Sequence, residues 1–276
     1  MHNPRRSQLY VPANDERKIA KSNSLSADSL IFDLEDAVPS SEKQRARESL
    51  RSLLERTEFS TSTELCVRIN KVTSDDYSNE DILAISKISK VNAIVLPKTE
   101  QISVDLSKRI GLPIIALIET ARGLLNVERI SSSPNVSAVS FGPQDFANSV
   151  VGNVEAYREN TYIKTHILVT AKASGIDAID GVFFKLNDLD GFRAEAIGSR
   201  NLGYIGKQVV HPTQVKIANE VYSVSEKEIE EARQIVEQYE KAQIEGSGAF
   251  RLNDALVDAV HYRRAKELLE RAQRKV

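Results

Sequence analysis

Short apolar segments alternate with helical sequence patterns through about the first 220 residues, and this alternation occurs eight times. The expected strands are residues 7–11, 29–34, 65–70, 93–97, 114–118, 136–141, 176–181 and 204–210. Asn14 or Asp15 caps the first helix, and Pro212 begins the eighth. The pattern predicts a (β/α)₈ (TIM) barrel. An open doubly wound sheet also alternates strands and helices, but it seldom needs eight repeats, and we find no glycine-rich phosphate-binding pattern after the first strand.

The fifth expected strand ends in a carboxylate. Residues 114–118 form a continuous apolar run, which suits a parallel sheet covered on both faces. Glu119 follows, and Thr120 offers a hydroxyl to cap the helix that begins at Ala121. Two interpretations of Glu119 are open. In the first, the negative charge of Glu119 stabilises the following helix by interacting with its dipole. In the second, Glu119 belongs to an active site, because the active sites of barrels are built at the carboxyl ends of their strands.

Composition excludes several classes of protein. With 276 residues, 41% of them hydrophobic, the chain can bury a large core in one big domain or two small ones. A net charge of −2, with both signs interspersed, indicates no nucleic-acid partner. We find no signal peptide and no membrane span, so we expect a cytoplasmic protein. The single cysteine, Cys66, excludes an intrachain disulfide and a cysteine-based zinc site.

The C-terminal part of the chain has a different pattern. We expect the barrel to occupy residues 1–222 and a long charged helix to fill most of residues 223–245. Residues 246–276 begin with a flexible Gly-Ser-Gly joint and carry a second helix from about Asp258. That helix cannot bury its apolar stripe alone. We therefore expect a helical lid segment on its own barrel or on a neighbour's.

Charged residues recur where the expected strands end, and most of them are acids: Glu35, Asp36, Arg68, Lys98, Glu119 and Asp145. In a barrel these positions share the face on which active sites are built. Carboxylates without a His or Cys cluster suit a hard cation such as Mg²⁺, with Mn²⁺ as an alternative. Arg68 among those acids would hold a carboxylate or a developing enolate oxygen. A ring of salt bridges closing the barrel mouth is the alternative to a metal site.

Seven motifs carry a resemblance to a known family. Arg-Ser-Gln-Leu-Tyr-Val-Pro opens the chain's first strand, and Asp-Leu-Glu-Asp-Ala-Val ends the second. The motifs lie at residues 6–12, 33–38, 67–70, 96–98, 118–120, 141–145 and 206–212. In this order and spacing they resemble the citrate lyase β-subunit-like family, which includes malyl-CoA and citramalyl-CoA lyases within the aldolase/citrate lyase group. The resemblance covers nearly the whole chain.

The resemblance implies roles for particular residues. It implies a Mg²⁺ ion held by Glu119 and Asp145, with Glu35 and Asp36 tied to its waters. It implies Arg68 at the thioester carbonyl and Asp258 as a lid acid/base contributed by an adjacent subunit, hence a homo-oligomer, a trimer by resemblance. The basic residues Arg6, Arg17, Lys21 and Lys98 are candidates for binding substrate or the coenzyme A carrier. Arg17 and Lys21 have an equally good interpretation as ordinary solvated helix charges.

The chain departs from the family pattern at two places. Ala13 stands where the family usually has glycine after the first strand, so a side chain could narrow the approach of a phosphate-bearing carrier. In the lid sequence at residues 253–260 only the last aspartate, Asp258, is kept, and Asp254 replaces a glycine. Lid geometry is therefore where this chain differs most from the family.

The leading functional hypothesis is a Mg²⁺-dependent carbon–carbon lyase that acts on a 3-hydroxy-3-carboxyacyl thioester such as malyl-CoA or citramalyl-CoA. One alternative keeps the site but hydrolyses the thioester or cleaves a free 2-keto-4-hydroxy acid. A second alternative, from another class, is a non-catalytic subunit or sensor that binds metal and acid ligands. The sequence leaves open the acyl chain, the stereochemistry, the direction of the reaction and the choice between coenzyme A and a protein-bound carrier.

Overall fold

The computed structural model of the chain describes residues 4–72, 77–252 and 254–273. It divides into two compact units, Met1–Tyr222 and Ser223–Val276, which we describe separately. Two parts of the expected lid segment, Asn253 and the end of its helix at residues 274–276, lie outside the described residues. No helix in the described ranges is long and apolar enough to cross a membrane.

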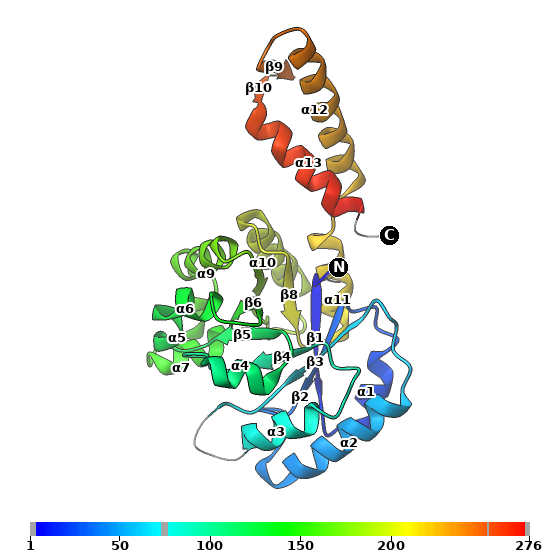
Figure 1. The fold of residues 1–276 in the computed structure, drawn as a ribbon, viewed down its shortest axis with the longest axis vertical. Coiled ribbons are helices and arrows are strands. Elements are labelled where there is room, and N and C mark those ends of the chain that lie inside the picture. Colours follow the sequence, from blue (N-terminus) through cyan, green and yellow to red (C-terminus); the bar gives the residue numbers. More distant parts are fainter. Residues whose placement is uncertain (1–3, 73–76, 253, 274–276) are drawn as a thin grey trace. The chain divides into compact units, whose positions relative to one another are not determined.

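The first unit is a closed barrel in which each strand pairs with the next and β8 pairs with β1, all in parallel (Figure 1). The predicted (β/α)₈ barrel is therefore confirmed. The strands are β1 Ser7–Pro12, β2 Ser29–Asp33, β3 Glu64–Arg68, β4 Ala93–Leu96, β5 Ile114–Ile118, β6 Val136–Phe141, β7 Asp177–Asp180 and β8 Gly206–Val209. Five of the eight, β2, β3, β4, β7 and β8, are one to three residues shorter than predicted, β5 and β6 have the predicted bounds, and β1 is one residue longer.

Helices surround the barrel, and most begin at a side-chain cap. Asp15 accepts a hydrogen bond from the Lys18 amide, and Thr120 accepts one from the Gly123 amide. The helices are α1 Glu16–Ser22, α2 Lys43–Arg56 after a short 3₁₀ turn at Ser40–Glu42, α3 Tyr77–Ile85, α4 Val104–Ile110, α5 Ala121–Leu125, α6 Val127–Ser131, α7 Pro143–Ser149, α8 Val154–Arg158, α9 Thr161–Ala173, α10 Leu189–Leu202 and α11 Pro212–Tyr222. The single helix expected after the fifth strand is divided at Asn126, whose side chain donates to the Glu100 carbonyl.

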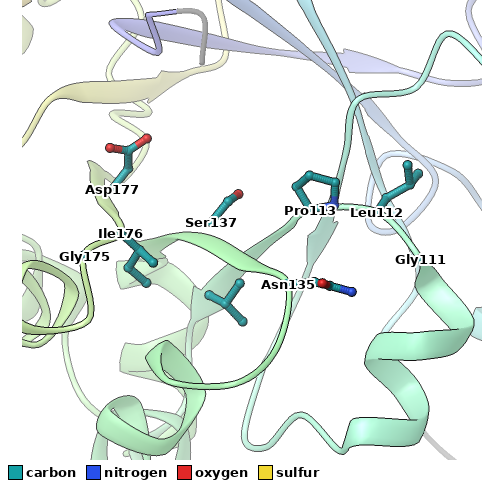
Figure 2. A pocket seen from close by; sticks show the side chains of 9 residues that line it. Gly111, Leu112, Pro113, Asn135, Ser137, Gly175, Ile176 and Asp177 are labelled. Atoms are coloured by element: carbon teal, nitrogen blue, oxygen red, sulfur yellow. The ribbon is translucent and has the colours of Figure 1, made fainter. Parts of the chain in front are cut away.

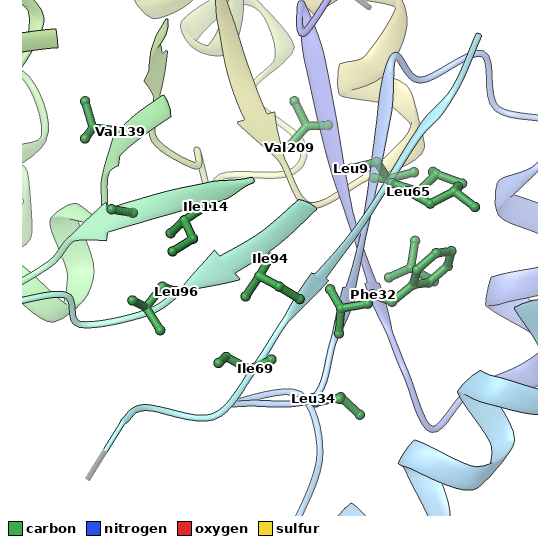
Figure 3. Close-up of a cluster of buried hydrophobic side chains, with 14 of the residues drawn as sticks. Leu9, Phe32, Leu34, Leu65, Ile69, Ile94, Leu96, Ile114, Val139 and Val209 are labelled. Atoms are coloured by element: carbon green, nitrogen blue, oxygen red, sulfur yellow. The ribbon is translucent and has the colours of Figure 1, made fainter. Parts of the chain in front are cut away.

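Apolar side chains fill both faces of the strands. Alternate residues point outward, so that Ile114 packs against the surrounding helices while Ile115 points into the barrel. The outer layer includes Leu9, Phe32, Leu65, Ile94 and Val209 (Figure 3). The inner layer is Ile31, Cys66, Ala93, Val95, Ile115, Leu117, Ala138 and Ile179. Each fully buried aliphatic side chain stabilises the fold by about 1.5–3 kcal/mol, so the barrel can hold polar groups at its rim.

The second unit is a helical hairpin with a small sheet between its helices. It consists of α12 Glu226–Ile244, β9 Ala249–Leu252, β10 Ala255–Asp258 and α13 Ala259–Gln273. Ser225 and Glu228 form a capping box at the start of α12. Tyr239 of α12 stacks on Tyr262 of α13 with ring centroids 4.7 Å apart. The antiparallel pair β9–β10 was not predicted from the sequence, which indicated only a glycine joint there.

Candidate active site

A cavity of about 420 Å³ opens at the carboxyl ends of the barrel strands. This size suits a small-molecule ligand. Its charged lining residues are Asp33, Asp36, Arg68, Glu119 and Asp145. The apolar lining comes from Pro12, Phe141, Pro143, Val182, Phe184 and Val210.

Arg68, the last residue of β3, is the best-fixed cation at this cavity. Its Nε and Nη2 donate to the two carboxylate oxygens of Asp33 over 2.8 and 2.6 Å. Its Nη1 lies 3.0 Å from Glu35 Oε2, and its guanidinium stacks over the Tyr10 ring, 4.9 Å from the centroid. Burial disfavours the charged guanidinium, but Tyr10 and Asp33 outweigh burial and raise the pKa of Arg68. The side chain is held charged and immobile.

Lys98 connects the second strand end to the fifth. It is in the left-handed conformation with φ of 45°, which costs a non-glycine residue about 1–3 kcal/mol. In that conformation its backbone amide donates to Glu119 Oε2 over 2.8 Å, and its Nζ donates to Glu35 Oε1 over 2.6 Å. Burial lowers the pKa of Lys98, but the hydrogen bond and charge of Glu35 raise it overall. The strained backbone therefore serves to aim one residue at two carboxylates.

Glu119 follows β5 and is 4% exposed. A Cβ atom on Gly142 would lie 2.5 Å from Glu119 Cγ and Oε1, so only glycine at 142 leaves room for this carboxylate. Burial, and next the negative charge of Glu35, raise the pKa of Glu119 to about 7. The hydrogen bond from the Lys98 amide lowers it only in part. Glu119 is thus a buried carboxylate whose negative charge is only partly compensated, by the Lys98 amide and by the charge of Arg68.

The charges at the cavity do not balance. Asp145, in the first turn of α7, has its Oδ1 3.8 Å from Lys98 Nζ. Two cations, Arg68 and Lys98, contact the carboxylates at this mouth, and the charge of Lys43 acts on three of them. Negative charge is still in excess when all groups are ionised, since the carboxylates are five: Asp33, Glu35, Asp36, Glu119 and Asp145. A divalent cation fits this excess and these oxygen donors.

The protein supplies only part of a coordination sphere. Within the described ranges no three His, Cys, Asp or Glu side chains converge as a ready-made metal cage. Mg²⁺ commonly takes only one or two carboxylates and keeps several waters. Four carboxylates line the cavity, and Asp33 and Asp36 are paired with Arg68. Asp145 makes a longer contact, of 3.8 Å, with Lys98, so Glu119 and Asp145 are the two that are most available to an ion.

Arg6 is not at this mouth. It directly precedes β1, and the residue before a parallel strand lies at the amino ends, opposite the active face. There its Nη2 pairs with Asp28 Oδ1 over 2.7 Å. The prediction that Arg6 helps to bind the carrier is therefore corrected. Arg17 and Lys21 are exposed on α1, whose first residue follows the carboxyl end of β1, so they stay candidates.

A second cavity, of about 360 Å³, lies at the amino ends of β5, β6 and β7 (Figure 2). Asp177 and Ser137 line it, and the buried Arg5 reaches both of them. Arg5 also pairs with Glu64 over 2.6 Å, which ties β3 to the segment before β1. This end of a barrel serves stability rather than chemistry, and we read the Arg5 cluster as the closure of the barrel floor.

Asp258 lies in the second unit, at the end of β10. Its Oδ1 is 2.8 Å from His261 Nδ1 and accepts a hydrogen bond from the Val260 amide over 2.9 Å. The hydrogen bond from His261, followed by the backbone amides, lowers the pKa of Asp258. Both side chains are partly exposed.

Sequence reasoning missed three residues of the barrel site. Asp33 is the partner that fixes Arg68. Tyr10 and Gln208 line the same cavity, and the Tyr10 hydroxyl donates to Gln208 Oε1 over 3.3 Å. A signal for Asp33 was present. It is two residues beyond the inward-facing Ile31, so the alternation of the strand turns it inward, and it pairs in register with Arg68.

Comparison with known proteins gives one consistent answer. The sequence pattern of the HpcH/HpaI aldolase/citrate lyase family matches residues 6–212. The chain is 34% identical to a (3S)-malyl-CoA thioesterase of Cereibacter sphaeroides, over 98% of this chain and 95% of that protein. It is 32% identical to the mitochondrial citramalyl-CoA lyase of Mus musculus, over 96% of this chain and 85% of that protein.

Among solved structures, the chain is similar to the protein CitE of Mycobacterium tuberculosis in complex with magnesium, acetoacetate and coenzyme A. The TM-score is 0.82 at 27% identity, with 98% of each chain covered. The resemblance stated from the motifs is thereby confirmed. The chain belongs to the HpcH/HpaI aldolase/citrate lyase family, a family of carbon–carbon lyases.

Proposed function

We propose that this protein is a Mg²⁺-dependent lyase that cleaves, or forms, the carbon–carbon bond of a 3-hydroxy-3-carboxyacyl-CoA such as malyl-CoA or citramalyl-CoA. One observation carries the proposal: the buried, partly compensated carboxylate of Glu119 and the carboxylate of Asp145 line one cavity with the guanidinium of Arg68, which is held by Asp33. The names of the relatives support the substrate class, and the magnesium and coenzyme A in the similar solved structure support the cofactor and carrier.

Glu119 and Asp145 would hold the ion, and the family resemblance gives Glu35 and Asp36 the role of binding its waters. When bound, Mg²⁺ supplies Lewis-acid polarisation of the substrate's carboxylate and hydroxyl oxygens. The protein orients its own ligands before any ion arrives. The Lys98 amide holds one oxygen of Glu119, and the bare backbone of Gly142 leaves space for the other.

In the cleavage direction the substrate hydroxyl loses its proton, and a carbonyl forms. Asp36 is a candidate acceptor for that proton because it lines the cavity and its side chain is 57% exposed. The bond from the hydroxyl-bearing carbon to the carbon next to the thioester breaks, and its electron pair forms a thioester enolate. Arg68 faces the same cavity and would stabilise the enolate oxygen through a charge-assisted hydrogen bond that strengthens as the charge develops.

Asp258 completes the reaction as the acid/base. In cleavage Asp258 starts protonated and donates its proton to the enolate carbon, and exchange with solvent afterwards removes the proton from Asp36 and restores the one on Asp258. In the synthetic direction the ionised Asp258 removes a proton from acetyl-CoA or propionyl-CoA. Arg17 and Lys21 on α1 are the remaining candidates for contacts with the phosphates of coenzyme A.

Hydrolysis of the same thioester is the second candidate, because a (3S)-malyl-CoA thioesterase is among the similar proteins. In that reaction water adds to the thioester carbonyl, the sulfur leaves as the coenzyme A thiol, and no carbon–carbon bond breaks. The two activities give different products from malyl-CoA. Lysis yields acetyl-CoA and glyoxylate, whereas hydrolysis yields free coenzyme A and malate.

Product analysis by chromatography tests the proposal. With Mg²⁺ present we expect acetyl-CoA and glyoxylate in equal amounts, and no turnover after chelation until Mg²⁺ is added back. Glu119→Gln should fold but should not regain activity with Mg²⁺. Free coenzyme A and malate as the only products would assign the hydrolase instead, and Mg²⁺-restored turnover by Glu119→Gln would refute the metal site.

A further inference from the structure

We infer that His261 is a positioning residue for the acid/base Asp258, and that the pair directs a single carboxylate oxygen, Oδ2, toward the reacting carbon. The inference rests on the proposed function, because it names a second residue that the proposed acid/base step requires. Nothing in the motifs indicated a role for His261.

The hydrogen bonds of Asp258 are one-sided. The His261 side chain, the Val260 amide and the His261 amide all lie within 3.4 Å of Oδ1, with His261 Nδ1 closest at 2.8 Å. In the part of the chain that the structure describes, Oδ2 takes part in none of these contacts. A carboxylate held at one oxygen keeps the other oxygen, with its lone pairs, available for proton transfer to or from carbon.

The helix α13, which carries His261, is anchored to α12 by side-chain contacts. Tyr262, the next residue of α13, stacks on Tyr239 and donates to Glu240 Oε1 over 3.0 Å. Lys266 Nζ lies over the Tyr262 ring, 5.4 Å from its centroid. His261 is therefore placed by a helix that is anchored to α12 immediately beside it, and this fixes the imidazole relative to Asp258.

His261 also governs the charge of Asp258. Other ion pairs of this unit join Lys227 to Glu231 and Lys241 to Glu237 on α12, and Arg251 to Asp254 at the turn. The β9 residue opposite Asp258 is Ala249, which carries no charge. Among the described residues of this unit, His261 is the one ionisable side chain that contacts Asp258. Its hydrogen bond lowers the pKa of Asp258 and so favours the ionised form that removes a proton from the acyl-CoA.

A helix cap alone would explain the same contacts, since Asp258 precedes α13 and His261 is in its first turn. The two roles predict different results. A cap contributes to the stability of α13. A positioning residue changes the rate of proton transfer and acts only when Asp258 can exchange protons.

The test uses the full-length protein with Mg²⁺ and follows the exchange of acetyl-CoA methyl protons with deuterated water by mass spectrometry. His261→Leu should lower the rate constant of exchange about tenfold or more with little change in KM, because a hydrogen bond to a charged group is lost. The low-pH limb of the rate profile should move to higher pH as the pKa of Asp258 rises. His261→Asn, whose amide can donate from the place of Nδ1, should restore most of the rate. His166→Asn, on α9 of the barrel, is the matched control and should be unaffected.

The decisive comparison places His261→Leu in the Asp258→Asn background, where we expect no further loss. An equal loss in both backgrounds, or wild-type exchange in His261→Leu, would overturn the inference alone. If His261→Leu unfolds the second unit, the comparison is made between His261→Asn and His261→Ala. A well-folded His261→Asn that exchanges protons no faster than His261→Ala would also overturn the inference. Absence of exchange in the wild-type protein would overturn the proposed function, and the inference with it.

Discussion

At the scale of single residues, the site is built from side chains that are costly to place. Glu119 is a buried acid, Lys98 has a left-handed backbone, and Arg68 is buried beside Asp33 and Glu35. Each of these features is destabilising by itself and is tolerated because neighbouring groups compensate for it. Glu119 is the exception, since no salt bridge to it is formed within the described ranges, and burial raises its pKa. We expect this excess to be measurable as a dependence of stability on pH.

Glu119→Gln should stabilise the metal-free protein at about pH 8. In the folded state the pKa of Glu119 is raised from 4.5 to about 7. The sign follows from linkage: a raised carboxyl pKa leaves full stability below pH 4.5 and loses it as the pH rises through about 7. Glutamine does not titrate, so the variant avoids a penalty on the order of 3 kcal/mol. Thermal unfolding in chelator across this pH range measures the difference.

The control is the same experiment with Mg²⁺ in excess. Binding to the folded state should then stabilise the wild type and leave the variant unchanged, so that the order of stability reverses. Equal melting curves for the two proteins across the whole pH range without metal would show that Glu119 is not a strained acid.

At the scale of elements, the parallel strands explain why so much could be predicted from sequence. A strand such as β5, which is apolar on both faces and is followed by a helix cap, suits a parallel sheet that helices cover on both sides. The carboxyl end of the strand then fixes the position of Glu119. Strand alternation also turns Arg68 inward, because it lies two residues beyond the inward-facing Cys66. Lys98 lies two residues beyond the outward-facing Leu96, and it reaches the same rim through its left-handed backbone. Arg6 lies at the opposite end of the barrel, because it precedes β1 and the chain crosses the whole barrel within this strand.

Other features depended on contacts between distant segments. The left-handed Lys98 is held by Glu119 and Glu35, which lie in other strand ends, and no local pattern indicates φ > 0 at a lysine. The division of the fifth helix depends on Asn126 reaching the Glu100 carbonyl. The hairpin β9–β10 is short and mostly exposed, so its sequence has weak strand character. The role of Gly142 is steric and could not be inferred without the position of Glu119.

Gly142→Ala tests that steric role at the level of the β6–α7 junction. The new methyl would lie 2.5 Å from Glu119 Cγ and Oε1, so the carboxylate must turn away while the strand stays in place. We expect Mg²⁺ affinity to fall by about 10–100-fold, as when a group that orients a metal ligand is removed. Calorimetric titration with Mg²⁺ measures this, and circular dichroism checks the barrel.

Gly198→Ala is the matched control, because a Cβ at this position in α10 meets no atom within 4 Å. This variant should bind Mg²⁺ normally and should gain up to about 1 kcal/mol of stability from the better helix propensity of alanine. Normal Mg²⁺ binding by Gly142→Ala would mean that Glu119 is not a ligand or that it binds from another rotamer.

At the scale of the whole molecule, the proposed chemistry is divided between two compact units. The metal ligands and Arg68 belong to the barrel, and Asp258 belongs to the helical hairpin unit. The apolar side chains of Leu256 and Val260, on either side of Asp258, are 69% and 59% exposed. Exposed apolar residues beside a catalytic acid suit a surface that is covered during the reaction. We therefore expect a homo-oligomer, a trimer by family resemblance, in which the hairpin unit of one subunit serves the barrel of another.

Mixed oligomers test this arrangement. Asp258→Asn keeps an intact barrel site but lacks the acid/base, and Glu119→Gln keeps the acid/base but lacks a proposed metal ligand. Each homo-oligomer should therefore be inactive. If the hairpin unit serves a neighbouring barrel, co-expression should restore activity, because an intact barrel then meets an intact Asp258. Random mixing in a cyclic trimer places such a pair at about a quarter of the sites. Light scattering gives the oligomeric state, and the product assay gives the recovered rate. Confirmed mixed oligomers without activity would instead assign Asp258 to the barrel of its own chain.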